Sequence, residues 1–354
     1  MNGAVVTIRD VARVAGCSIA TVSRVATGSV PVADATRQRV IAAALSLNFP
    51  LGRGPSASRA VLGVLVPSLA NPVFAAALAG IERCARLRGV STVIAQSHYL
   101  PEGEDEGVRA LMAERPRGLI LTVCDPATSR ALGEIAAQRL PAATIYNGSG
   151  PAGVGSVAVD NRGAMALVVL ELLKAGHRRI LFVGGRFASS DRSAARHVGY
   201  RDALQAVGVR PLPPLEVDFI DAAQDIDLTA ALDRHRPTAI AASNDLLAVS
   251  AIASLDRMGL SVPRDVSVTG FDGMELATLI RPRLTTVAQP STAMGMVAAS
   301  MVLDMAAGAR GPEALRVDAT LLRGETIGPA PGPQSLSPSA NLPTTETPTP
   351  CFSD

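Results

Sequence analysis

The sequence predicts an all-α unit at the N-terminus, followed by a larger α/β region with parallel sheets in two lobes. Residues 5–47 contain short helical patterns and no strand signal, whereas residues 61–327 alternate β-rich apolar runs with helix-length segments. Apolar strands that alternate with helices are typical of parallel sheets covered on both faces. The second region holds about nine strand candidates, which are too many for one sheet of ordinary size and favour two lobes.

The composition favours a soluble protein with a large hydrophobic core. Of the 354 residues, 48% are hydrophobic, and the mean hydropathy is +0.28. Gly, Pro or charge nevertheless interrupts every long apolar run before it reaches the ~18 residues of a membrane-spanning helix. The first residues lack the basic start and apolar run of a signal peptide. We therefore expect a cytoplasmic protein that has no membrane partner.

Positive charge is concentrated at the N-terminus. The first 60 residues contain seven arginines and two aspartates, a net charge of +5, so the remaining residues carry −3 of the overall +2. A basic unit on a mildly acidic body indicates that only the first part meets a polyanion such as nucleic acid. Small basic domains are common, so the charge alone does not decide the partner.

Neither the cysteines nor the histidines predict a metal site. Cys17, Cys84, Cys124 and Cys351 include no CxxC pair, and the four histidines lack the spacing of metal ligands. We expect reduced cysteines in packing or tail positions, no metal and no cofactor. Residues 328–354 are rich in Pro, Ser and Thr, a composition that predicts a disordered tail.

Three short helices are expected within residues 7–47. Thr7 and Asp10 predict a capping box at the start of the first helix. The apolar face of that helix, spaced i, i+3, i+4, i+7, consists of Ile8, Val11, Ala12 and Ala15. Gly16 permits a tight turn, and Ser18 is placed to cap the second helix. The third helix, residues 34–47, would bury Val40, Ala44 and Leu47.

This arrangement matches a helix-turn-helix, in which the second helix enters the major groove of DNA. Near the start of that helix, Ile19 and Ala20 would face base edges, where small apolar groups contact thymine methyls. Arg24, one turn later, would bind a guanine or a phosphate, and Thr21 and Ser23 suit phosphate contacts. An ordinary helical hairpin would show the same periodicity, so the pattern alone leaves both interpretations open.

The strand candidates of the larger region share a short, apolar, β-rich composition. They cover residues 61–66, 90–95, 118–123, 142–146, 156–159, 180–184, 215–219, 239–243 and 266–271. Helix-length segments separate most of them, for example 73–88, 162–175 and 245–258. Ligands of such sheets bind beyond the carboxyl ends of the strands. Two lobes would therefore hold a ligand in the cleft between them.

Polar side chains that follow these strands are candidate ligand-binding residues. They are Asn71, Asp160, Arg196, Asn244, Asp245 and Asp272. Carboxylates, amides and a guanidinium hydrogen-bond hydroxyl groups well, and Phe74 and Phe219 could stack on a sugar face. Each acid could instead cap a turn or helix, as Asp245 would for the helix after it, and Asp265 is more typical of a structural residue. Only 3% of the residues are aromatic, so a small or charged ligand remains open.

The N-terminal segments resemble a known DNA-binding motif. Residues 7–12 (TIRDVA) and 15–25 (AGCSIATVSRV) closely resemble the motif of the lactose-repressor (LacI/GalR) family of transcription regulators, and Thr36, Arg37 and Val40 continue the match. The resemblance implies a homodimer that binds double-stranded, pseudo-palindromic operator DNA. It adds Thr7, Ser18 and Arg37 to the residues expected at the DNA.

The chain departs from the family pattern within and after this motif. Thr27 stands where the family usually has Asn, and Ala33 where it has Ser, so we expect a weaker backbone contact and a weaker helix cap. The family's hinge is a short helix that inserts a Leu into the minor groove. Here the shorter, Gly/Pro-rich residues 49–59 (FPLGRGPSASR) replace it. We expect no hinge helix, although Arg53 and Arg59 can still bind phosphate.

The resemblance extends through residues 62–327 and implies two lobes like those of periplasmic sugar-binding proteins. Matching segments occur in the family order at residues 62–67, 71–74, 176–180, 196–200, 243–245, 262–272 and 284–290. By family position the strongest effector-binding candidates are Asp160, Arg196, Asn244 and Asp272. Phe74 and Phe219 would form walls. Thr122 and residues 219–223 depart from the pattern, which leaves the identity of the effector open.

The resemblance implies a repressor, nucleoid-associated when bound to DNA, whose operator affinity changes when a small, sugar-like molecule binds between the lobes. We expect residues 1–47 to bind DNA, 48–61 to form a hinge, 62–327 to bind the effector and 328–354 to form the tail. An inducer is the commoner arrangement and a corepressor the alternative. A transport-associated binding protein would not need residues 7–25, and an enzyme would need a nucleophile, metal set or phosphate loop that the sequence does not display.

Overall fold

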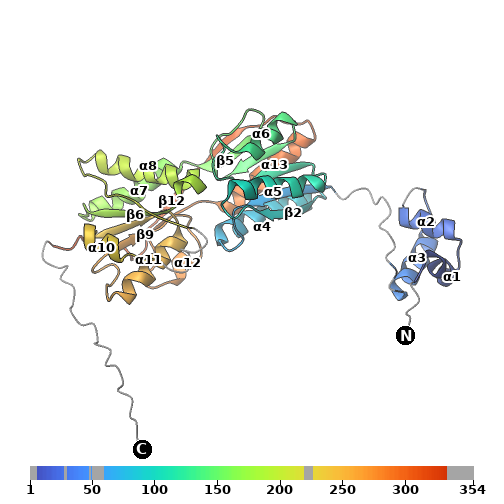
Figure 1. Cartoon of the computed structure of the whole chain (residues 1–354), viewed down its shortest axis with the longest axis horizontal. Coiled ribbons are helices and arrows are strands. Elements are labelled where there is room, and N and C mark those ends of the chain that lie inside the picture. Colours follow the sequence, from blue (N-terminus) through green and yellow to red (C-terminus); the bar gives the residue numbers. More distant parts are fainter. Residues whose placement is uncertain (1–5, 28–29, 48, 50–59, 219–225, 333–354) are drawn as a thin grey trace, which may run out of the picture.

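The computed structural model describes residues 6–27, 30–47, 49, 60–218 and 226–332. They form a three-helix unit and two α/β lobes that lie side by side (Figure 1). Within these ranges no helix is both long and apolar enough to cross a bilayer. The same ranges contain no group of His, Cys, Asp and Glu side chains that could hold a metal ion. Residues 50–59 of the predicted hinge, with Arg53 and Arg59, lie outside the described residues, as do Phe219 and Cys351.

The N-terminal unit consists of α1 (Ile8–Ala15), α2 (Ile19–Thr27) and α3 (Asp34–Ser46). Asp10 accepts hydrogen bonds from both the backbone N–H and the hydroxyl of Thr7, at 3.0 and 2.8 Å, which confirms the predicted cap. Gly16 ends α1 in the left-handed conformation. A small apolar core joins the three helices through Val11, Ala12, Ala15, Val22, Val40, Ala43 and Ala44. This core fixes the angle at which α2 is presented.

The first lobe is built on a six-stranded parallel sheet in the order β11-β5-β4-β3-β1-β2. Its strands are β1 (Val61–Val66), β2 (Ser91–Gln96), β3 (Gly118–Leu121), β4 (Ala142–Ile145), β5 (Gly155–Val159) and β11 (Ala314–Val317). Its helices are α4 (Pro72–Leu87), α5 (Pro101–Ala113), α6 (Arg130–Ala137) and α13 (Ser291–Ala306). Alternate residues of β1 pack into different cores, with Val64 on the α4 and α13 face and Leu65 on the α5 and α6 face.

The second lobe is built on a four-stranded parallel sheet in the order β7-β6-β8-β9. Its strands are β6 (Ile180–Gly185), β7 (Leu215–Val217), β8 (Ala239–Ala242) and β9 (Ser267–Thr269). Its helices are α7 (Asn161–Lys174), α8 (Asp191–Gln205), α10 (Thr229–His235), α11 (Asp245–Arg257) and α12 (Leu276–Leu279), with a 3₁₀ turn, η1 (Phe187–Ser189). On β6, Phe182 packs toward α8, whereas Val183 packs into the core beside α11.

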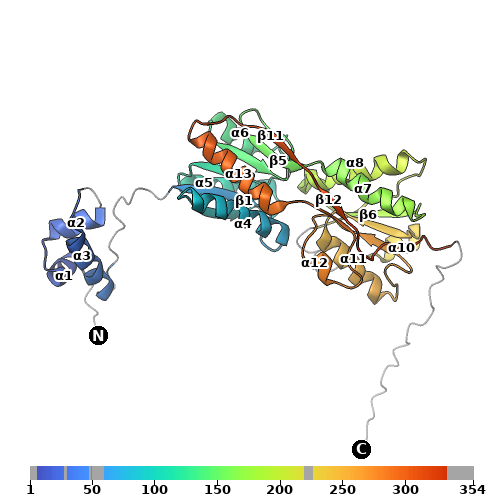
Figure 2. The same cartoon turned by 180° about the vertical axis from the view of Figure 1, so that it is seen from behind.

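The chain passes between the lobes at three places. It leaves the first lobe between β5 and α7, returns between β10 (Thr286–Ala288) and α13, and leaves again between β11 and β12 (Thr320–Leu322). Strands β10 and β12 pair antiparallel with each other, and they lie where the lobes meet (Figure 2). The three crossing segments therefore lie beside the space between the lobes.

The sequence located all nine of the strands it proposed, each within a few residues of its observed bounds. It missed β10, β11 and β12, which are only three or four residues long; β11 and β12 are in addition half-buried or exposed, whereas β10 is largely buried. The first residues of the predicted tail, from residue 328, are among the described residues. Residues as far as Ala330 belong to the second lobe, because the Ala330 N–H donates to the Ala175 carbonyl and the His177 ring hydrogen-bonds the Gly328 carbonyl. Residues 333–354 lie outside the described ranges.

Candidate functional site

The first turn of α2 is an exposed surface. Ser18, Ile19, Ala20 and Arg24 are exposed, whereas Val22 is fully buried against α1 and α3. Because Val22 anchors the inner side of α2, the predicted base-contacting residues point away from the core. This is the presentation that a groove-reading helix requires.

Local hydrogen bonds already engage several of the hydroxyls expected at DNA. Ser18 Oγ accepts from the Thr21 N–H at 3.1 Å, which confirms the predicted cap of α2. The Ser18 and Thr21 hydroxyls also hydrogen-bond each other at 2.8 Å. Ser23 and Arg37 are half-buried, and the Arg37 Nε has no partner among the described residues. Of the two predicted arginines that the structure describes, Arg24 is thus the one with more freedom to reach a DNA contact.

A second candidate site is a cavity between the two lobes. The empty space between its lining residues is about 370 Å³, counting the part that opens to solvent. It is lined by Asn71, Val73, Phe74, Tyr99, Tyr146, Ser190, Arg192, Ser193, Arg196, Ser243, Asn244, Asp272 and Gln289. Both lobes and the crossing before α13 contribute to this lining.

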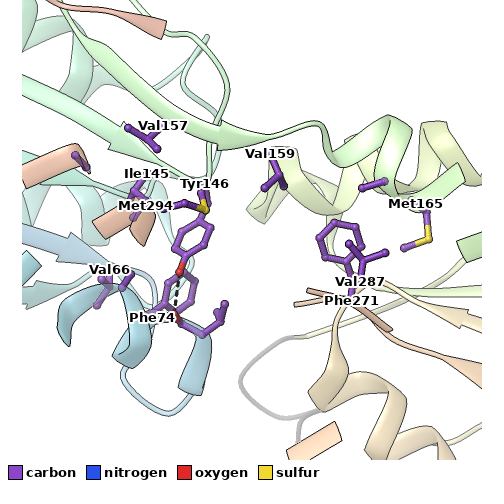
Figure 3. Packing of buried hydrophobic residues seen from close by; sticks show 14 of the residues in the cluster. Val66, Phe74, Ile145, Tyr146, Val157, Val159, Met165, Phe271, Val287 and Met294 are labelled. Carbon is purple, nitrogen blue, oxygen red and sulfur yellow. Dashed lines mark hydrogen bonds between the residues drawn. The ribbon is translucent and has the colours of Figure 1, made fainter. Parts of the chain in front are cut away.

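The first lobe supplies an aromatic wall. The rings of Phe74 and Tyr146 meet edge to face, with 5.6 Å between their centroids. The Tyr146 hydroxyl donates to the Val73 carbonyl at 2.8 Å and fixes the ring (Figure 3). Tyr99 is buried beside them. Figure 3 shows Phe271 and Val287 on the opposite side, in the second lobe.

The second lobe supplies a buried charged pair. Arg196 Nη1 lies 3.4 Å from Asp272 Oδ1, and both side chains are almost fully buried. Arg196 also donates from Nε to Asn161 Oδ1 at 2.8 Å and from Nη1 to the Ser243 carbonyl at 2.5 Å. The guanidinium carbon lies 3.6 Å from the centre of the Phe271 ring. These contacts hold Arg196 in one position at the cavity wall.

Burial shifts the ionisation of this cluster. It lowers the pKa of Arg196 to about 10, although Asp272 acts in the opposite direction. Burial also raises the pKa of Asp272 to about 6, against the effect of Arg196. Behind them, burial and the charge of Asp272 raise the pKa of Asp245 to about 8. At neutral pH the cluster therefore contains a charged pair and a largely protonated Asp245.

Two lining side chains have polar atoms without a partner. The Ser243 hydroxyl and the Gln289 Oε1 are buried and make no hydrogen bond within the described part of the chain. Gln289 uses only its Nε2, which donates to Asp272 at 2.7 Å. An unpaired buried polar atom is costly and indicates a missing partner. Hydroxyl groups of a bound molecule could satisfy both atoms.

The backbone at the cavity is strained. Tyr99, Tyr146 and Asp272 have positive φ angles of 59°, 71° and 114°. Side-chain-bearing residues rarely adopt this region, and such strain is concentrated at functional sites. These conformations aim the three side chains toward the cavity lining.

A hydrogen-bonded junction between the lobes borders the cavity. At the start of α8, Arg192 Nη1 donates to the Val123 carbonyl at 2.7 Å, and the Asp191 N–H donates to the Cys124 carbonyl at 2.7 Å. Asn147 donates from Nδ2 to Asp191 Oδ1, also at 2.7 Å. Both residues of α8 thus hold the first lobe directly beside the cavity.

The structure brings together five of the seven predicted effector residues. Asn71, Phe74, Arg196, Asn244 and Asp272 all line the cavity. Asn71 and Asn244 in addition cap α4 and α11 through their side-chain oxygens. The sixth, Phe219, lies outside the described residues.

Asp160 is not part of the cavity lining. It caps α7, where its carboxylate accepts from the Gly163 N–H at 3.0 Å, and it lies 3.4 Å from the exposed Arg316. The alternative of Asp245 as a helix cap is wrong, because Asn244 caps α11. Asp245 is buried and accepts from the Thr286 hydroxyl and the Met274 N–H. Asp265 is structural, as expected, and accepts from the Ser261 N–H at 2.7 Å.

Sequence reasoning missed several lining residues, chiefly Tyr99, Tyr146, Arg192 and Gln289. Gln289 was within a matching segment but was given no role. Arg192 precedes Arg196 by four residues on α8, so the helical period could have indicated that both face the same way. The tyrosines gave no signal, because their place in the cavity depends on left-handed backbone.

Two family models match the chain. The bacterial regulatory proteins, lacI family, match residues 7–50, and a periplasmic binding protein-like domain matches residues 169–327. The first covers the three-helix unit. The second covers most of the second lobe and the segments that return through the first.

Individual proteins match over most of the chain. The HTH-type transcriptional regulator GntR of Escherichia coli (strain K12) is 31% identical over 302 residues, which are 84% of this chain and 90% of that protein. The crystal structure of the lac repressor dimer bound to operator and the anti-inducer ONPF has a TM-score of 0.70 at 28% identity, covering 91% of this chain and 99% of that one. A complex of the transcriptional regulator CelR with cellobiose has a TM-score of 0.67 at 26% identity, with the same coverage.

Proposed function

Because the chain belongs to the lacI family of bacterial regulatory proteins, and is thus a DNA-binding transcription regulator, we propose that it is a repressor controlled by a small polar effector. The effector, a sugar or sugar derivative, binds in the cavity between the lobes. The observation that carries this proposal is the pair of buried, unpartnered atoms, Ser243 Oγ and Gln289 Oε1, beside the fixed Arg196–Asp272 pair.

The proposal divides the chain by role. Residues 1–47 bind DNA, residues 48–61 connect, residues 62–327 bind the effector and residues 328–354 form the C-terminal segment. The separate apolar core of α1, α2 and α3 supports an independent DNA-binding unit. The first turn of α2 enters the major groove, where Ile19 and Ala20 face bases and Arg24 binds a guanine or a phosphate. Contacts to the sugar-phosphate backbone of the DNA come from the remaining predicted residues, which are Thr7, Ser18, Thr21, Ser23, Arg37, Arg53 and Arg59.

The regulator acts as a homodimer on pseudo-palindromic operator DNA. The solved lac repressor at 28% identity is itself described as a dimer bound to operator. In this chain, Leu69, Ile94 and Leu100 are each about half exposed near the free edge of β2. Leu69 lies beside the end of that strand, because its N–H donates to Gln96 at 2.8 Å. A second copy that covers this edge would bury all three.

The effector acts by favouring one arrangement of the lobes. Arg192 and Asp191 join the second lobe to the first beside the cavity, so a ligand that contacts both lobes binds the joined arrangement more tightly than an open one. Differential affinity of this kind shifts a conformational equilibrium and is reciprocal with DNA affinity. We infer an inducer, which releases the repressor from DNA, in a cytoplasmic, nucleoid-associated protein.

The test measures binding of the full chain to DNA from its own promoter by fluorescence anisotropy, with and without sugars, sugar acids, polyols and nucleosides. Specific binding that weakens with one compound is the expected result. Strengthened binding would identify a corepressor instead. The Asp272→Asn variant should bind the promoter but lose the response, since it removes the charge that holds Arg196. A normal response in that variant contradicts the cavity assignment, and an absence of specific DNA binding contradicts the regulator.

A further inference from the structure

Two arginines line the cavity one helical turn apart. Arg192 and Arg196 both lie on α8, and each side chain is only 7% exposed. Like charges four residues apart repel on a helix, and the repulsion grows as water is excluded. Consistent with this, Arg192 acts with burial to lower the pKa of Arg196. The two side chains thus place two cationic groups close together at the cavity wall, an arrangement that an anionic ligand would stabilise.

The hydrogen bonds of Arg192 leave one edge of its guanidinium open. Both of its bonds use Nη1, one to the Val123 carbonyl at 2.7 Å and one to Asp191 at 3.0 Å. Within the described residues, Nε and Nη2 of Arg192 have no hydrogen-bond partner. They are not among the fully buried atoms that lack a partner, so a molecule in the cavity can reach them. The Nε and Nη2 edge is the fork that binds a carboxylate through two parallel hydrogen bonds.

The charges that face the cavity are unequal. Of its lining residues, Arg192 and Arg196 are cationic, and Asp272 alone is acidic. Asp191 pairs with Arg192 but is not part of the lining, and Asp245 lies behind Asp272 with a pKa raised to about 8, chiefly by burial. One further negative charge balances the lining, whereas a dianion would leave an excess of negative charge in a buried site.

We propose that the effector is a sugar acid, a polyhydroxyl compound with one carboxylate, and that Arg192 binds this carboxylate. The inference rests on the proposed function and specifies its ligand. The hydroxyl groups of the same molecule satisfy Ser243 Oγ and Gln289 Oε1. Arg192 also holds the Val123 carbonyl of the first lobe, so the carboxylate binds at the contact between the lobes. Binding of the carboxylate by Arg192 would thereby favour the arrangement in which the two lobes are joined.

The experiment compares compounds of one carbon skeleton on the full chain by titration calorimetry. D-glucose, D-gluconate, D-glucuronate and D-glucose 6-phosphate form one series, and D-galactose, D-galactonate and D-galacturonate form a second. In at least one series a carboxylate compound should bind at least about tenfold more tightly than the neutral sugar, as a charge-assisted bidentate bond predicts. The phosphate compound distinguishes a monoanion from a dianion.

The Arg192→Gln variant keeps a polar side chain but removes the charge. It should lose about tenfold to a hundredfold in affinity for the acid and less than about threefold for the neutral sugar. Arg192→Lys should lose less affinity for the acid than Arg192→Gln does, because lysine keeps the positive charge but cannot form two parallel hydrogen bonds to a carboxylate. Arg162→Gln is the matched control, because Arg162 is 64% exposed on α7, and it should bind every compound as the original chain does.

The outcomes separate the two proposals. Tighter binding of a neutral sugar or of the phosphate, or equal losses for acid and neutral sugar in Arg192→Gln, would overturn the sugar-acid assignment and leave a sugar-like effector in place. Failure of all seven compounds to bind would count against both proposals. Tight binding of an acid that never changes promoter affinity would support the ligand assignment and contradict its role as effector.

Discussion

In the three-helix unit most charged side chains are exposed, and the bonds they make within the described part of the chain are to residues nearby in the sequence. The arginines of the cavity are buried and also bond residues far away along the chain. Asp10 pairs with Arg13, three residues away, and Ser18 pairs with Thr21. Arg196, by contrast, contacts Asn161 and Asp272, from separate parts of the second lobe. The exposed side chains of the three-helix unit can therefore leave water and contact DNA without loss of the bonds that stabilise the unit. In the cavity, by contrast, the Arg196–Asp272 pair is held by partners within the fold, so the loss of either member leaves a buried charge behind.

This difference predicts where substitutions are costly. A surface ion pair contributes roughly 0–1 kcal/mol because water and salt screen it. A buried pair that loses one partner leaves an uncompensated charge, which costs roughly 3–5 kcal/mol. Effects on stability should therefore be largest in the cavity, and effects on DNA binding should be confined to the three-helix unit.

The largest effect is expected for Arg196→Met. It leaves Asp272 buried without its cation and the Asn161 side chain without its donor, so unfolding should become easier by about 3–5 kcal/mol. The measurement is urea unfolding followed by circular dichroism. Arg162→Met removes the exposed pair with Asp202 from the neighbouring helices and should cost less than about 1 kcal/mol. Equal shifts in both variants would abolish the distinction between buried and exposed charge.

Asp245 gives the cavity a pH dependence. The pKa of Asp245 is about 8 in the fold, raised chiefly by burial, against the ordinary aspartate value of 3.8. The folded state therefore holds the proton more tightly than the unfolded state does. The contribution of Asp245 to stability is full below about pH 4 and is lost as pH rises toward 8, by up to about 1.4 kcal/mol per pH unit.

Unfolding curves between pH 5 and 8 test this sign. The Asp245→Asn variant should lose less stability than the original chain as pH rises. Asp265→Asn is the control, because its bond with Arg264 lowers the pKa of Asp265, so its titration lies below this window. That variant should show a constant offset. A slope that survives in Asp245→Asn would assign the pH dependence to another group, such as Asp272, whose pKa burial also raises.

The same contrast explains what the sequence could predict. The helices of the N-terminal unit were predicted from apolar periodicity and from capping residues within three positions of the helix start. The nine strands were predicted from short apolar runs. Both patterns involve only residues that are close together in the sequence. Arg192 was missed because its role depends on Val123 in the other lobe. Asp160 was assigned to the cavity because it follows a strand and because of its family position, but its carboxylate caps α7. A position after a strand indicates the neighbourhood of a site, while the direction of the side chain depends on backbone angles.

In the exposed unit, Arg24→Ala should weaken operator binding by about 1–3 kcal/mol if the guanidinium reads a base. Stability should barely change, because Arg24 is exposed. Fluorescence anisotropy with the operator and with operators that differ by a single base pair distinguishes a contact to a base from a contact to a phosphate. A loss that is equal on every DNA would identify a phosphate contact. Arg86→Ala, an exposed arginine on α4, is the control and should leave DNA binding unchanged.

The smallest effect concerns the start of α3. Ala33 occupies the cap position in a non-helical conformation and makes no side-chain bond to the helix, whereas Ser18 before α2 accepts from the Thr21 N–H. Ala33→Ser supplies the missing acceptor and should stabilise the unit by about 0.5–1 kcal/mol, while Ser18→Ala should destabilise it by about 1 kcal/mol. Hydrogen exchange of the full chain, read by mass spectrometry, should show slower exchange in α3 for the first variant and faster exchange in α2 for the second. The cavity peptides should not change in either variant. A change there would show that the stability of the three-helix unit is coupled to the lobes, and the two regions would then have to be treated as one cooperative unit.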